Sequence, residues 1–337
     1  MTIKMEDIAR LANVSRSAVS LALNGKEGVS EETRNRIFKV IDEYNYQPLR
    51  KRHQGTHHKL ATVNFLAVRS SGLVNKNFRT LPFFDSLISA LSENVSAFGG
   101  NLQIQTINSE DLKYMPKDSN SNKLSGTIVL GTDLTEAQVQ MILDKYHNVV
   151  FIDTYFPNVT ANFVTMDNYQ GAYAAGEYII SKGYKNIGYV ASNKLISNFN
   201  YRRKGFDDAL RKHHLEVTNN HLYTSEPTEL NPEGLDIHKI LQQDTPDAIF
   251  CEDDYIAIRL LKSCLQNKID IPNDLAIMGF DDIYETQLLS PELSTIHVNT
   301  QQIATQALAH LQGQVGNTDW SPQKTLIATS VVPRASL

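Results

Sequence analysis

The chain has 337 residues, 41% of them hydrophobic and 20% charged, which is typical of a soluble globular protein of two or three domains. The net charge of −5 divides into +3 over residues 1–58 and −8 over residues 59–337, a balance that favours a small nucleic-acid-binding head on an acidic body. No membrane-length apolar run, no secretory signal and no CxxC pair is found, so we expect a cytoplasmic protein without a membrane span, a disulfide scaffold or a cysteine zinc cluster.

Residues 5–24 predict a helix, a tight turn and a second helix. Apolar residues at positions 8, 11 and 12 mark the first helix, Asn13 ends it, and Ser15 is a suitable N-cap for a second helix over 16–23. This is the layout of a helix-turn-helix, whose second helix lies in the major groove of DNA. The alternative is an ordinary three-helix cap on a larger protein.

A third helix is predicted to begin after Ser30 and to end before Pro48, with Glu31 and Glu32 at the positive end of its dipole. The composition then changes sharply over residues 49–60, which carry four Lys or Arg and three His among almost no apolar residues. We interpret this segment as a basic linker or hinge; the alternative is a solvated charged face.

Beyond residue 60, short runs rich in Val and Ile alternate with amphipathic stretches. Strands are expected at 61–68, 102–107, 126–130, 149–153, 163–167, 186–191, 248–251 and 275–281. Helices are expected at 83–98, 169–183, 201–213 and 255–266. The alternation predicts an α/β fold with parallel sheets, and the length of the segment favours two sheets over one.

Motifs of common enzyme classes are missing from the sequence. It contains no G-x-G-x-x-G, no Walker loop, no G-x-S-x-G and no H-E-x-x-H, so we expect neither an enzyme nor a bound cofactor. The pairs His57–His58 and His213–His214 have no further ligands beside them in the sequence and are assigned no metal.

The segment 7–48 resembles, nearly position for position, the DNA-binding head of the LacI/GalR family of bacterial repressors. The body carries further motifs in the family's order: VTMDNYQGAYAAG (164–176), R-x-x-G-F (202–206), CEDD (251–254), IMGFDD (277–282) and LSTI (293–296).

The resemblance implies a helix-turn-helix head over 1–48, a linker over 49–60 and a two-lobed body over 61–333, like a periplasmic binding protein with two parallel sheets. Its first lobe, nearer the DNA, is expected to comprise about 61–182 plus 297–318. The second lobe is expected to comprise about 183–296 plus 319–333.

The family's DNA contacts map onto the second helix and the linker of this chain. They correspond here to Ser15, Arg16, Ser17, Ala18, Leu21, Asn24, Arg50, Lys51 and Arg52. Leu21 stands where the family commonly has Arg; it cannot donate to guanine but can pack on a thymine methyl group. Gly55 takes the place of the leucine that the family wedges into the minor groove, so we expect a weaker kink and phosphate contacts from the basic linker.

An effector site between the two lobes is implied as well. Its residues correspond to Phe83, Asn198, Arg202, Asp253 and Asp281. Arg202 can donate to neighbouring hydroxyl groups or to a carboxylate, Asp281 can accept from a hydroxyl, and Asp253 adds a charge where the family usually has Asn. The alternative is that Arg202 and Asp281 simply pair with each other and that Phe83 belongs to the core.

The resemblance therefore implies a homodimeric DNA-binding transcription regulator, a repressor whose affinity for double-stranded operator DNA is controlled by a small ligand, expected to be a sugar. A dimer is expected because two heads one helical turn apart read a palindrome. Two alternatives remain: a solute-binding protein of a transporter, and a DNA-binding regulator signalled by a phosphorylated protein partner.

Overall fold

The computed structural model describes residues 5–23, 28–44, 62–116, 126–228, 240 and 245–337. Asn24 and the three basic linker positions Arg50, Lys51 and Arg52 lie outside the described residues. The chain divides into two compact units, Met1–His57 and His58–Leu337, and each is described by itself. No helix of the described part of the chain is long and apolar enough to cross a membrane.

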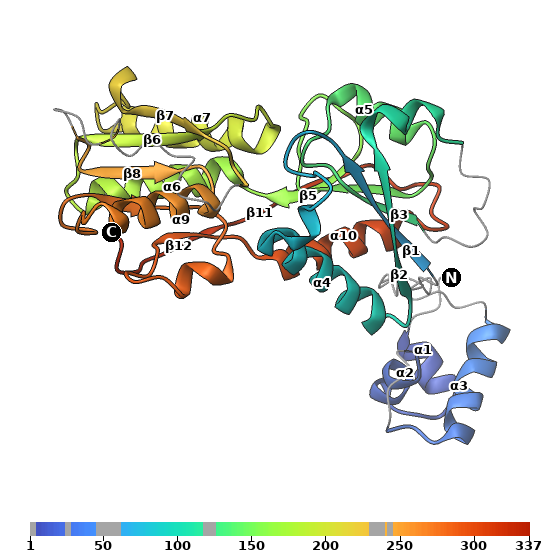
Figure 1. Ribbon diagram of the computed structural model, residues 1–337. Coiled ribbons are helices and arrows are strands. Elements are labelled where there is room, and N and C mark those ends of the chain that lie inside the picture. The colour runs from blue at the N-terminus through green and yellow to red at the C-terminus, as the bar shows by residue number, and fades with distance from the viewer. Residues whose placement is uncertain (1–4, 24–27, 45–61, 117–125, 229–239, 241–244) are drawn as a thin grey trace. The chain divides into compact units, whose positions relative to one another are not determined.

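The first unit contains the three predicted helices, α1 (Met5–Leu11), α2 (Arg16–Leu23) and α3 (Glu31–Glu43) (Figure 1). The cap at the start of α2 is confirmed, because Ser15 Oγ accepts a hydrogen bond from the backbone N–H of Ala18 at 3.1 Å. The turn before α2 passes through Asn13, whose φ of 53° lies in the left-handed region that Asn tolerates. The three helices enclose a small core of Ile8, Ala9, Ala12, Val19, Ala22 and Ile37.

The second unit begins with a six-stranded parallel sheet in the order β11–β5–β4–β3–β1–β2, which we call the first-lobe sheet. Its strands are β1 (Thr62–Arg69), β2 (Asn101–Asn108), β3 (Gly126–Leu130), β4 (Val149–Ile152), β5 (Asn162–Met166) and β11 (Lys324–Ile327). Helices α4 (Pro82–Ala97) and α10 (Thr300–Gln314) share one hydrophobic core with this sheet, and α5 (Glu136–Leu143) shares the other. Both faces are therefore covered, as Val- and Ile-rich parallel strands require.

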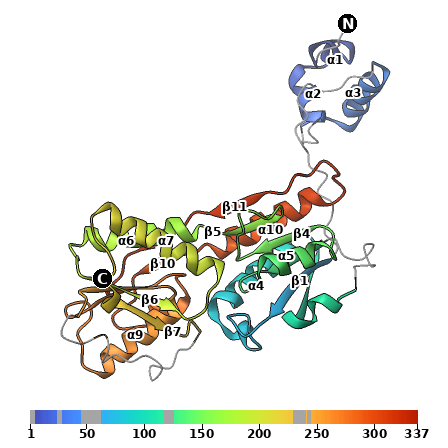
Figure 2. The same cartoon turned by 90° about the horizontal axis from the view of Figure 1, so that it is seen from above.

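A four-stranded parallel sheet in the order β7–β6–β8–β9 forms the second lobe. Its strands are β6 (Ile187–Ser192), β7 (Leu222–Ser225), β8 (Ala248–Cys251) and β9 (Ala276–Met278). Its helices are α6 (Asn168–Ser181), α7 (Ser197–Lys212) and α9 (Asp254–Gln266), with α6 and α7 side by side (Figure 2). Short 3-10 turns occur at Phe78–Thr80, Ser109–Tyr114, Asn219–His221 and Tyr284–Gln287.

Two of the predicted lobe boundaries are wrong. The helix α6 was expected in the first lobe, but its Gly176 lies against Ala209 and lets α6 pack closely on α7 of the second lobe. The segment 319–333 was expected in the second lobe, but β11 within it hydrogen-bonds to β5 and completes the edge of the first-lobe sheet. The residues of a strand favour an extended backbone, but they do not determine which sheet the strand joins or at which edge.

The described chain passes between the lobes at three places: from β5 to α6, from β10 (Thr295–His297) to α10, and from β11 to β12 (Ser330–Val332). The two short strands β10 and β12 pair antiparallel and form a separate two-stranded ribbon. After β12 the chain returns to the second lobe, where the Ser336 carbonyl accepts from the backbone N–H of Ile277 at 2.9 Å.

Candidate functional site

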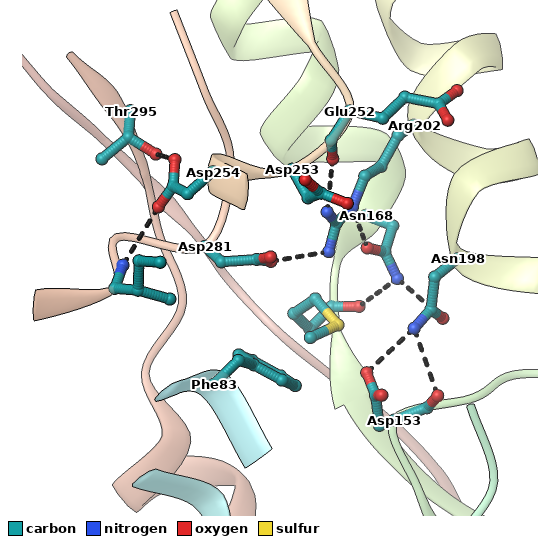
Figure 3. A network of polar contacts seen from close by, with 12 residues as sticks. Phe83, Asp153, Asn168, Asn198, Arg202, Glu252, Asp253, Asp254, Asp281 and Thr295 are labelled. Carbon is teal, nitrogen blue, oxygen red and sulfur yellow. Dashed lines mark hydrogen bonds and ion pairs between the residues drawn. The ribbon is translucent and has the colours of Figure 1, made fainter. Parts of the chain in front are cut away.

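The carboxyl ends of the strands in the two lobes meet at a small polar cavity. Asp153 follows β4 of the first lobe, while Asp253 and Asp281 lie beyond β8 and β9 of the second. All five residues of the predicted effector site line this cavity: Phe83, Asn198, Arg202, Asp253 and Asp281 (Figure 3). Ligands of open α/β sheets bind at such strand ends. The structure therefore brings the predicted residues together in one place.

Arg202 of α7 lies at the centre of the polar network and is almost completely buried. Its Nε donates to Asn168 Oδ1 at 2.8 Å and its Nη1 to the Glu252 carbonyl oxygen at 2.6 Å (Figure 3). Its Nη2 donates to Asp281 Oδ1 at 2.8 Å, and its guanidinium carbon stands 3.7 Å from the centre of the Phe280 ring. These contacts fix the orientation of the Arg202 side chain. They include the ion pair between Arg202 and Asp281 that the sequence offered as an alternative to contacts with a ligand.

Contacts across the cavity join the two lobes. Asn198 of α7 donates through Nδ2 to the carbonyl oxygen of Asp153 at 3.1 Å and to its Oδ1 at 2.9 Å. The backbone N–H of Phe83, in the first turn of α4, donates to Tyr255 Oη of α9 at 3.1 Å. These hydrogen bonds link the lobes across the cavity, which has a volume of 30 Å³.

Sequence reasoning missed Asp153, Thr132 and Tyr255 as cavity residues. Thr132 Oγ1 donates to Asp153 Oδ2 at 2.5 Å, so both oxygens of this buried carboxyl accept hydrogen bonds from neutral groups. Asp153 could have been recognised as a site residue because it directly follows a strand rich in Val and Ile. Asp281 was selected from the sequence for the same reason.

Asp253 has a different environment for each of its two oxygens. Its Oδ1 accepts from the backbone N–H of Ile256 at 2.8 Å and so caps the N-terminus of α9. Its Oδ2 is buried and accepts no hydrogen bond from any residue that the structure describes. A buried acceptor without a donor is costly, so this oxygen is the unsatisfied group of the cavity.

Burial raises the pKa of each carboxyl group in the cavity. The pKa of Asp153 is raised to about 7 and that of Asp281 to about 6, where desolvation outweighs the opposing effect of Arg202. The pKa of Asp253 is raised well above its usual value, again chiefly by desolvation. The neighbouring Asp254, which accepts from Thr295 Oγ1 at 2.6 Å, has a pKa raised to about 7. Perturbed pKa values of this kind cluster at functional sites.

In the first unit, the predicted DNA-binding residues at the start of α2 differ in exposure. Ser15, Arg16 and Ser17 are exposed, whereas Ala18 and Leu21 are half-buried. Arg16 Nη1 forms an exposed ion pair with Glu6 Oε1 of α1 at 3.1 Å. The exposed residues at the start of α2 therefore include polar donors, which are the groups that a recognition helix uses to contact bases.

Comparison with known families accounts for both units. Residues 4–48 match the bacterial regulatory proteins of the lacI family, and residues 177–337 match the periplasmic binding protein-like domain. The chain belongs to the LacI family. The family consists of DNA-binding transcription regulators, so the chain is such a regulator with an effector-binding body and is not an enzyme.

LacI-family relatives match the chain over nearly its whole length. The ribose operon repressor of Haemophilus influenzae is 27% identical over 338 residues, covering 99% of this chain and 98% of that protein. The NTD biosynthesis operon regulator NtdR of Bacillus subtilis is 26% identical over 336 residues, covering 98% and 99%.

Solved structures of LacI-family proteins share the fold. The lac repressor dimer bound to operator and the anti-inducer ONPF has a TM-score of 0.69 at 17% identity, covering 100% of this chain and 99% of that one. The transcriptional regulator CelR in complex with cellobiose has a TM-score of 0.68 at 20% identity and covers 99% of both chains. The predicted fold class, a helix-turn-helix head followed by a body with two parallel sheets, is thereby confirmed.

Proposed function

We propose that this LacI-family protein is a cytoplasmic, homodimeric repressor whose affinity for operator DNA is controlled by a sugar bound in the cleft between its lobes. The observation that carries this proposal is the convergence of Arg202, Asn198 and Asp281 on one cavity walled by Phe83. Charged and amide groups beside an aromatic wall suit a small molecule rich in hydroxyl groups. The cellobiose bound to the structural neighbour CelR supports a sugar as the ligand class.

A ligand can control DNA binding only if it binds the two arrangements of the lobes with different affinity. The present cavity of 30 Å³ is far smaller than the roughly 300–1,000 Å³ of ordinary ligand sites. A sugar bound among these residues would separate the lobes and replace contacts such as those from Asn198 to Asp153 and from Phe83 to Tyr255. Binding in the cleft is thus coupled directly to the distance between the lobes.

On DNA, we propose that Arg16 and Ser17 make the polar base contacts and that Leu21 packs on a thymine methyl group. Ser15, Ala18 and Asn24, with the linker residues at 50–52, are assigned to the remaining contacts. Selection of binding sites from random DNA tests this assignment. An obligatory guanine opposite Leu21, unaffected by Leu21→Ala, would show that the head docks differently.

A thermal-shift screen of the full chain against a panel of sugars, with and without operator DNA, tests the cleft. A bound sugar is expected to raise the melting temperature by mass action. In Arg202→Ala, the loss of a charged donor from the site should weaken sugar binding by roughly 2–4 kcal/mol, while operator binding persists. Arg211→Ala on the exposed part of the same helix is the matched control. Unchanged sugar affinity in Arg202→Ala would refute the assignment.

A further inference from the structure

The cavity is lined by more acidic than basic side chains. Among its described lining residues, Asp153, Asp253 and Asp281 are acidic and Arg202 is the one cation. Arg202 donates to only one of the three carboxyl groups, that of Asp281. Its other two hydrogen bonds go to the neutral oxygens of Asn168 and of the Glu252 backbone. The buried carboxyl groups of Asp153 and Asp253 therefore have no hydrogen-bonded cation among the described residues.

The oxygen Oδ2 of Asp253 is a buried acceptor that lacks a hydrogen-bond donor among the described residues. Asp253 is only 2% exposed, lines the cavity, and its Oδ2 accepts from no described residue. An ionised aspartate presents acceptors only, and it adds a negative charge. The unsatisfied oxygen therefore marks the point of the cleft where a donor from a ligand would fit.

We propose that the effector is a cationic polyol, a sugar or sugar alcohol carrying a protonated amine, whose ammonium group binds Asp253 Oδ2. This inference rests on the proposed function of the cleft and narrows its ligand class. A neutral sugar hydroxyl could donate to the same oxygen, but it would leave the carboxylate charge uncompensated in a desolvated cavity. An ammonium group supplies the donor and the charge together.

The charges around Asp253 point to the same kind of ligand. Desolvation raises the pKa of Asp253, and the charges of Asp281 and Asp254 act in the same direction while Arg202 opposes them. A bound ammonium group would add a second positive charge beside Arg202 and so favour the ionised carboxylate.

Isothermal titration calorimetry on the full chain at pH 7.5 measures the affinities that test this proposal. The probes are three matched pairs: glucosamine and glucose, galactosamine and galactose, mannosamine and mannose. N-acetylglucosamine serves as an uncharged analogue of glucosamine. At least one amine is expected to bind 10-fold or more tightly than its neutral partner.

The variant Asp253→Asn should reduce that preference at least 10-fold. It retains an N-cap for α9, because asparagine caps helices as well as aspartate does. Operator binding reports that the variant is folded. The control Asp207→Asn removes a half-exposed carboxylate of α7 that does not line the cavity and should leave the preference unchanged.

Neutral sugars that bind as tightly as their amino partners would overturn this inference and leave the proposed sugar function standing. An amine preference that survives in Asp253→Asn would overturn the assignment to Asp253. If no member of the panel binds while the chain still binds operator DNA, the sugar proposal fails and this inference fails with it.

Discussion

Replacing Arg202 by leucine should destabilise the body strongly, because it leaves a buried carboxylate without its cation. Leucine fills part of the space of the arginine stem but removes the three hydrogen bonds to Asn168, Glu252 and Asp281. Arg202 and Asp281 are 4% and 8% exposed in their side chains, so solvent screens their pairing only weakly. Breaking one partner of a buried ion pair costs about 3–5 kcal/mol. We expect a decrease of that size in the free energy of unfolding at pH 7.5.

The double variant Arg202→Leu with Asp281→Asn distinguishes the cost of the unpaired Asp281 carboxylate from the cost of the lost hydrogen bonds. Asparagine carries no charge, so about half of the decrease should be recovered if the uncompensated carboxylate dominates. Arg211→Leu is the control, since its pair with Asp207 is 70% and 45% exposed and should contribute about 0–1 kcal/mol. Urea titrations followed by circular dichroism measure all four proteins.

The pH dependence gives a second test of the same pair. The pKa of Asp281 is about 6 in the folded protein against 3.8 for the ordinary group, so the folded state binds more protons between these values. The contribution of this carboxyl group to stability therefore falls as pH rises through that window. Arg202 lowers the pKa of Asp281, so in Arg202→Leu the window extends upward and the decrease in stability should grow from pH 5 to pH 8. A decrease that is independent of pH, or a double variant as unstable as the single one, would refute the reasoning.

Three further outcomes are expected. Gly205→Ala should lower the melting temperature, because the added Cβ would collide with the carbonyl oxygen of Tyr169 at a cost of about 1–3 kcal/mol; an unchanged melting temperature would contradict this close packing of α6 and α7. Glu6→Gln should raise operator affinity several-fold at low salt in a fluorescence anisotropy titration, since it releases Arg16; weaker binding would show that Arg16 does not face DNA. Replacing the basic residues 50–52 together by alanine should flatten the slope of log affinity against log salt by roughly two to three units, and an unchanged slope would mean that this segment does not touch DNA.

Most of the buried framework could be predicted from the sequence, because its strands are short runs of Val and Ile between amphipathic helices. The elements that were missed have weaker patterns. The helix α10 begins with TQQIATQ, whose polar residues obscure its buried Ile303 and Ala304, and β11 has an exposed lysine and only one fully buried residue. The lobe assignment failed because pairing between β11 and β5 depends on the approach of segments far apart in the chain.

Only part of the cavity could be predicted, because some of its residues are brought together from distant parts of the chain. Arg202 and Asp281 carry motifs that resemble those of a known family, and the structure places them in contact. Asp153 and Tyr255 join the cavity because the two lobes approach each other, which no local pattern encodes. The unsatisfied state of Asp253 Oδ2 likewise depends on its three-dimensional neighbours and could not be read from the chain.

The pairing of β11 with β5 also governs the order in which this chain can be completed during synthesis. Lys324 pairs with Phe163, about 160 positions earlier, so β5 remains an open sheet edge until almost all of the body has left the ribosome. Neither lobe is a continuous piece of sequence, so neither can be obtained by simple truncation. A chain shortened before position 324 would keep every strand of the second-lobe sheet but expose β5, and it should aggregate through that edge rather than fold into a smaller repressor.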